Sequence, residues 1–98
     1  KGSLFRLYYE GKDISKKLHD DQKENQLQGI SYRLLNACKS GNKQLFFDTL
    51  MRLYLMADRR IDPAFLNILH EKDMEFTEVG YSFITGLQAQ PKEDKENE

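Results

Sequence analysis

Several kinds of residue and segment are scarce in this 98-residue chain, and each absence excludes a class of protein. The one cysteine, Cys38, forms no disulfide within the chain and cannot supply a zinc site made of several thiolates. No apolar run approaches the roughly 20 residues that a membrane helix needs, and the first residues lack the pattern of a signal peptide. We therefore expect a cytoplasmic protein with no membrane partner.

Signatures of catalysis are also absent. His19 and His70 are far apart in the sequence, and neither has a cysteine or carboxylate at the spacing of metal ligands. The neighbouring Asp20 and Asp21 are expected on a solvated face, not in an apolar pocket that would suit acid-base chemistry. Glycine-rich phosphate loops and nucleophile elbows do not occur. The sequence predicts a protein that is not an enzyme and that holds no cofactor or metal.

The chain has no large excess of positive or negative charge, but basic and acidic residues are distributed unevenly along the sequence. The net charge is −1, whereas residues 33–60 contain six basic and two acidic side chains, and residues 61–90 contain one basic and five acidic ones. Mixed charge is the usual way to keep a protein soluble, but a basic segment also suits contact with a phosphate backbone. The candidate nucleic-acid-binding residues are the basic ones of that segment: Arg33, Lys39, Lys43, Arg52, Arg59 and Arg60. An ion pair with Asp48 is an equally good account of Arg52.

Apolar residues recur at steps of three and four along the chain, which is the period of an amphipathic helix. The pattern predicts helices around residues 4–18, 27–38, 43–57, 63–70 and 76–87. No segment alternates as a strand does. We expect an all-α fold, a compact bundle of about five helices forming a single domain over residues 1–90, with a disordered acidic tail over residues 91–98.

Local signals place the helix ends and one close contact. Gly41 is suited to the left-handed stop of one helix and Asn42 to the cap of the next. Asp62 and Pro63 form a typical helix start. Gly11 lies inside an apolar stripe, where a glycine costs about 1 kcal/mol relative to alanine, so we expect it to permit the close approach of a second helix.

The segment 43–57 is apolar on nearly all sides, which predicts a helix at the centre of the bundle. Its polar exceptions, Asp48 and Arg52, fall on one edge together with Arg59 and leave a strip for solvent or a partner. Most of the aromatic residues lie on apolar stripes and are expected in the core. Tyr9 and Tyr32 fit the apolar stripes least well. If they are exposed, their rings could stack on unpaired bases of a nucleic acid.

Three segments resemble a known family: Tyr32-Arg33-Leu34-Leu35-Asn36-Ala37, Arg52-Leu53-Tyr54, and Phe83 to Leu87. They resemble the C-terminal helical region of the large subunit of type I-B CRISPR Cascade complexes, the Cst family, and the likeness spans roughly residues 8–87. In that family the same region is also made separately, from an internal start, as the small subunit of the effector complex. The resemblance implies that this chain is such a small subunit.

The resemblance also implies partners and a role in antiviral defence. Copies of the small bundle line the crRNA-containing complex beside the large and backbone subunits, where they hold target DNA and mainly the displaced non-target strand. Guide pairing reads the sequence in such a complex, while protein charge holds the backbone. Two other functions stay open: a helical protein-protein adaptor without nucleic-acid contact, and a helix-turn-helix regulator with Gly41 in its turn. The apolar segment 45–57 disfavours the regulator, because a recognition helix needs a polar outer face.

Overall fold

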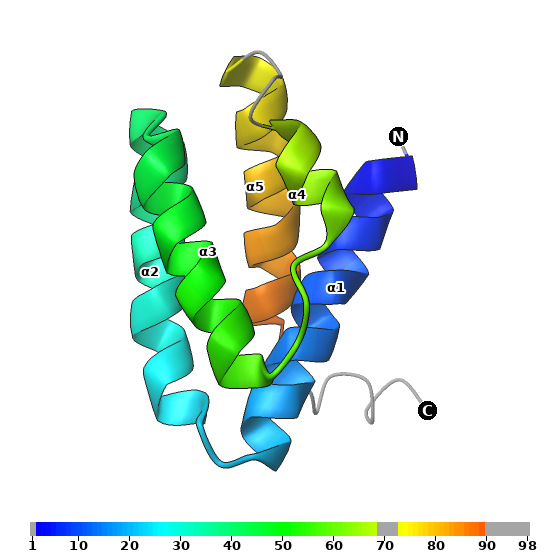
Figure 1. Cartoon of the computed structure of the whole chain (residues 1–98), viewed down its shortest axis with the longest axis vertical. Coiled ribbons are helices and arrows are strands. Elements are labelled where there is room, and N and C mark those ends of the chain that lie inside the picture. The colour runs from blue at the N-terminus through cyan, green and yellow to red at the C-terminus, as the bar shows by residue number, and fades with distance from the viewer. Residues whose placement is uncertain (1, 69–72, 90–98) are drawn as a thin grey trace.

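The computed structural model describes residues 2–68 and 73–89. Within these ranges the regular structure is entirely helical (Figure 1), which confirms the predicted all-α class. Four long helices and one helix of six residues make up the described chain: α1 (Gly2–Asp20), α2 (Glu24–Ser40), α3 (Lys43–Ala57), α4 (Pro63–Ile68) and α5 (Asp73–Gln88). The predicted acidic tail and His70, where we expected the short helix to end, lie outside the described residues.

The turn between α2 and α3 forms as the local signals predict. Gly41 has a φ of 69°, and its amide N–H donates to the carbonyl of Cys38 at 3.1 Å. The Asn42 side chain accepts a hydrogen bond from the amide of Leu45 at 3.0 Å and so caps α3. Because the connection is this short, α2 and α3 pack against each other as an antiparallel pair (Figure 1).

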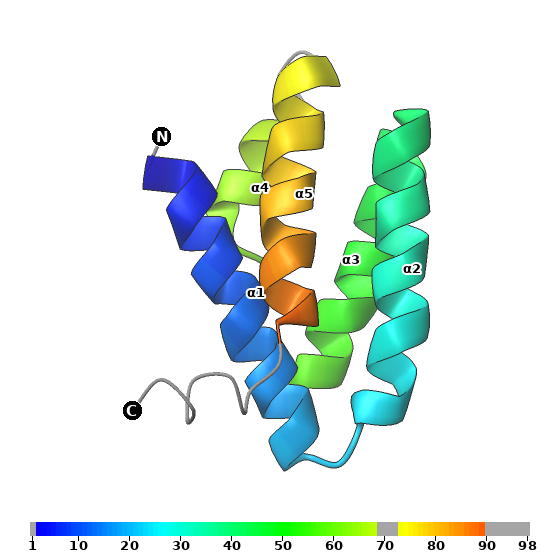
Figure 2. The same ribbon diagram turned by 180° about the vertical axis from the view of Figure 1, so that it is seen from behind.

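Helix α5 occupies the middle of the bundle, between α1 and α2 (Figures 1 and 2). Glycines permit the closest contact, between α1 and α5. A Cβ on Gly11 would overlap the carbonyl oxygen of Phe83 and lie 2.7 Å from the amide nitrogen of Leu87. A Cβ on Gly86 would overlap the carbonyl oxygen of Tyr8. The close approach predicted at Gly11 is confirmed, and Gly86 supplies the other half of the same crossing.

Aromatic side chains form the centre of the core. Phe46, Phe65, Phe76 and Phe83 are fully buried, and the rings of Phe65 and Phe83 meet edge to face with centroids 4.9 Å apart. With Tyr54, five of the eleven aromatic residues are buried and Phe47 packs against them, so the expectation that most aromatic residues lie in the core holds only in part. Outside the core, Tyr9 and Tyr32 are exposed as expected, while the exposure of Phe5 and Tyr81 was not foreseen.

The predicted central position of α3 is wrong. Leu45, Met51 and Leu55 lie on its outer side, and Leu55 keeps 80% of its surface exposed. Apolar residues on all sides of a helix indicate that each side favours contact with other protein atoms. They do not show whether those atoms belong to the core of the same chain or to a partner protein. None of the described helices combines the length and apolar character needed to cross a membrane.

Cys38 lies in the core, with its sulfur against Gly80 of α5. Burial raises the pKa of the Cys38 thiol from 9.0 to about 11. Near pH 8 the folded protein should therefore contain about 100-fold less Cys38 thiolate than the unfolded chain. We expect a thiol reagent to label the native protein at least that much more slowly than the urea-unfolded protein, and equal rates would contradict the burial of Cys38.

The same pKa difference predicts a loss of stability in alkali. The folded protein holds the thiol proton more tightly, so this contribution is complete below pH 9.0 and is lost as the pH rises toward about 11. Its full size is about 2–3 kcal/mol. Urea unfolding across this pH range measures it, and a Cys38→Ala variant is the control, since its unfolding free energy should lack this component.

Candidate nucleic-acid interface

The six predicted basic residues do not form one patch. Arg33 and Lys39 lie on α2, while Lys43 is the first residue of α3 and Arg59 follows its end. A helix of 15 residues is about 22 Å long, so Lys43 and Arg59 are separated by the length of α3. Lys39 and Lys43 therefore lie near the turn between α2 and α3, and Arg59 and Arg60 lie in the loop after α3. Arg33 and Arg52 lie within α2 and α3.

The outer side of α2 holds the clearest cationic group. Tyr32, Arg33, Asn36, Lys39 and Ser40 are all exposed, and their spacing places them within an arc of about 120° on the helix. We call these five residues the α2 face. The acidic residue of α2, Glu24, lies two turns before Tyr32. The α2 face therefore presents two cations and an aromatic ring without a carboxylate of its own.

Lys43 and Arg52 do not join the α2 face. Lys43 is half-buried, and its ammonium lies 5.8 Å from the centre of the Phe76 ring, a cation-π contact with the core. Arg52 is exposed on the outer side of α3. The described structure has no ion pair between Arg52 and Asp48, the partner that the spacing suggested.

Arg59 is engaged in a contact within the protein. Its guanidinium donates to one carboxylate oxygen of Glu10 at 2.8 Å, and the Tyr54 hydroxyl donates to the other oxygen at 2.8 Å. Burial, together with this hydrogen bond to Glu10, raises the pKa of Tyr54 above its ordinary value. Glu10 thus fastens α1 to the end of α3, and Arg59 neutralises its charge.

The loop after α3 and the outer side of α1 form a shallow groove that sequence reasoning missed. Arg60 and Tyr9 are exposed along it, and Arg6 pairs with the buried Asp62 at 3.2 Å. Three arginines and three carboxylates line this groove, so its charges balance: Arg6, Arg59 and Arg60 against Glu10, Asp13 and Asp62. A balanced groove is less suited to phosphate than the α2 face.

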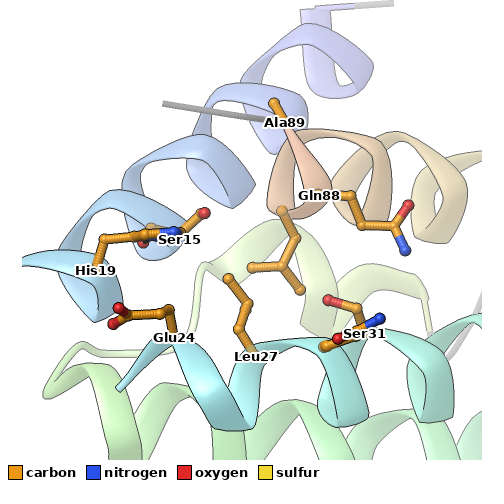
Figure 3. Close-up of a pocket in the computed structure, with 9 residues that line it drawn as sticks. Ser15, His19, Glu24, Leu27, Ser31, Gln88 and Ala89 are labelled. Atoms are coloured by element: carbon orange, nitrogen blue, oxygen red, sulfur yellow. Dashed lines mark hydrogen bonds between the residues drawn. The ribbon is translucent and has the colours of Figure 1, made fainter. Parts of the chain in front are cut away.

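A pocket of about 420 Å³ lies between the C-terminal end of α1, the first half of α2 and the C-terminal end of α5 (Figure 3). The hydroxyls of Ser15 and Ser31 line it, and both are buried without a hydrogen-bond partner in the described structure. His19 stands at its rim and donates from Nδ1 to the carbonyl oxygen of Ser15 at 2.8 Å. The pocket suits water or a small polar molecule, and the described residues that line it include no lysine or arginine to hold phosphate. In the sequence, the feature that could have indicated this pocket is the position of Ser15 and Ser31 among the apolar residues of their helices.

No group of three metal-ligating side chains comes together among the described residues. Among the surfaces described above, the α2 face is the most suited to nucleic acid, because its two cations have no carboxylate beside them. No protein-family model matches the chain, and neither a curated protein nor a solved structure does.

Proposed function

We propose that this chain is a non-catalytic small subunit of a crRNA-guided type I-B Cascade complex. In this role it binds the large subunit, the backbone subunits and further copies of itself. It stabilises the R-loop by contacts to target DNA that do not depend on sequence, mainly to the displaced non-target strand. The resemblance of Tyr32 to Ala37, Arg52 to Tyr54 and Phe83 to Leu87 supports the assignment to this family.

The observation that carries the nucleic-acid role is the α2 face. Lysine and arginine side chains bind phosphates without reading bases, and an exposed tyrosine stacks on an unpaired base. Arg33 and Lys39 accompany Tyr32 on this face. A single face with two cations binds weakly, so the proposed affinity arises when several copies act together in the assembled complex.

The test compares two double charge reversals with equal change in net charge. Arg33→Glu with Lys39→Glu alters the α2 face, and Lys16→Glu with Lys17→Glu alters two cations of α1 that are outside the predicted set. Each variant is co-expressed with a large subunit, backbone subunits and guide RNA, and retention of target DNA by the purified complex is measured at several salt concentrations. We expect the first variant to enter the complex, lose DNA retention, and reduce the salt slope by about 0.7 for each phosphate that it no longer binds.

The second double variant should retain DNA as the unaltered chain does. An equal loss in both variants would indicate a general effect of charge and would contradict the role of the α2 face. A chain that stays outside the complex would overturn the small-subunit assignment.

A helical protein-protein adaptor is the second candidate, and the exposed leucines of α3 favour it. An adaptor binds no DNA even at low salt, whereas contact with phosphates weakens steeply as salt rises. Fluorescence anisotropy with a labelled single strand therefore separates the two functions.

A further inference from the structure

The outer side of α3 carries a pattern that neither the core nor the proposed DNA contact explains. Leu45, Asp48, Arg52 and Leu55 are exposed and follow one another at steps of three, four and three residues. These steps are those of the a and d positions of a heptad, the positions that meet a partner helix in a coiled coil. We call these four residues the α3 seam. Met51, exposed by 56%, extends its apolar surface.

The order of the α3 seam is symmetric about Leu50. Leu45 and Leu55 lie at equal distances along the chain from this residue, and so do Asp48 and Arg52. In an antiparallel pair of identical helices, an a position faces a d position of the partner. With a two-fold axis at the level of Leu50, each Leu45 meets the other copy's Leu55. Each Asp48 then meets the other copy's Arg52, so that two apolar contacts flank two ion pairs.

The charges of the α3 seam are available for such a contact. Asp48 and Arg52 stand four residues apart on one helix, where an ion pair within the helix is possible. The described structure contains no hydrogen bond or ion pair of either side chain, and both are exposed. A purely apolar partner helix would bury both charges unpaired, and a parallel copy would place like charges together. The antiparallel second copy satisfies both charges.

We propose that two copies of this chain associate through their α3 seams, antiparallel and about a two-fold axis. The contact is isologous, since each copy supplies the same surface. A helix of about 22 Å makes a small interface, so the dimer is reversible and forms as the protein concentration rises. This inference does not rest on nucleic-acid binding, because the α2 face is not part of the α3 seam.

The test measures the molecular mass of the purified chain by sedimentation velocity over a wide range of concentration. Asp48→Arg and Arg52→Asp each place like charges together in a homodimer, so we expect either change to raise the dissociation constant at least about 10-fold. Mixing the two variants should restore a dimer, because every charge then faces its opposite. A chain with both changes should also dimerise, because the swap preserves complementarity.

Circular dichroism checks that each variant keeps its helices, and Leu55→Lys provides a second route to a weakened dimer. The unaltered chain remaining a monomer at every concentration would overturn the proposal. A dimer that neither single charge change weakens, or a mixture that does not restore association, would overturn it too, since the copies would then use another face.

Discussion

Gly86→Ala is expected to lower the free energy of unfolding of the chain strongly. The new Cβ would overlap the carbonyl oxygen of Tyr8 and lie 2.8 Å from its carbonyl carbon. These are backbone atoms of α1, so no side chain can rotate out of the way, and the two helices must separate. Overpacking in a core typically costs about 1–3 kcal/mol even where side chains adjust, and a domain has only about 5–15 kcal/mol of stability. We expect a loss of more than about 3 kcal/mol.

The matched control is Gly29→Ala in the middle of α2. Gly29 is exposed, and a Cβ built on it meets no atom within 4 Å. Alanine favours a helix interior over glycine by about 1 kcal/mol, so this variant should be slightly more stable than the unaltered chain. Urea unfolding followed by circular dichroism measures both changes. Equal stability of the two variants would show that α1 and α5 do not cross at Gly86.

Phe65→Ala is expected to have the second largest effect. The Phe65 ring is fully buried, and its centroid lies 4.9 Å from that of Phe83 and 6.1 Å from that of Phe46. Removing a buried phenylalanine ring costs about 3–5 kcal/mol, because the burial is lost and a cavity remains. Helix α4 has six residues and is too short to be stable alone, so Phe65 is also its anchor to the bundle.

Leu66→Ala is the control for this prediction, since Leu66 is the next residue of the same helix and is 51% exposed. We expect it to change the unfolding free energy by at most about 1 kcal/mol, within the range of surface substitutions and the helix preference of alanine. Thermal unfolding of the two variants, compared with the unaltered chain, distinguishes removal of a core ring from a general weakness of α4. Similar losses of stability in both variants would contradict the anchoring role of Phe65.

The basic residues of the candidate nucleic-acid interface could be predicted from the sequence only in part. The basic character of residues 33–60 was evident, but the division of its cations was not. Arg59 pairs with Glu10, which is 49 residues away in the sequence, and Lys43 lies against Phe76 of α5. Pairing over such separations depends on how the helices cross, and no local spacing encodes it. Arg33 and Lys39 share a face because they belong to one helix whose period relates them.

The sequence by itself determined the turn between α2 and α3 and the start of α4. Gly41 and Asn42 act through their own backbone preference and a hydrogen bond three residues away, and Pro63 acts through its missing N–H. Tertiary structure alone decided which apolar sides are covered. Gly86 is recognisable as a crossing point only once Tyr8 lies against it. Helix α3 keeps leucines exposed because α5 occupies the centre, and burial depends on the arrangement of all helices together.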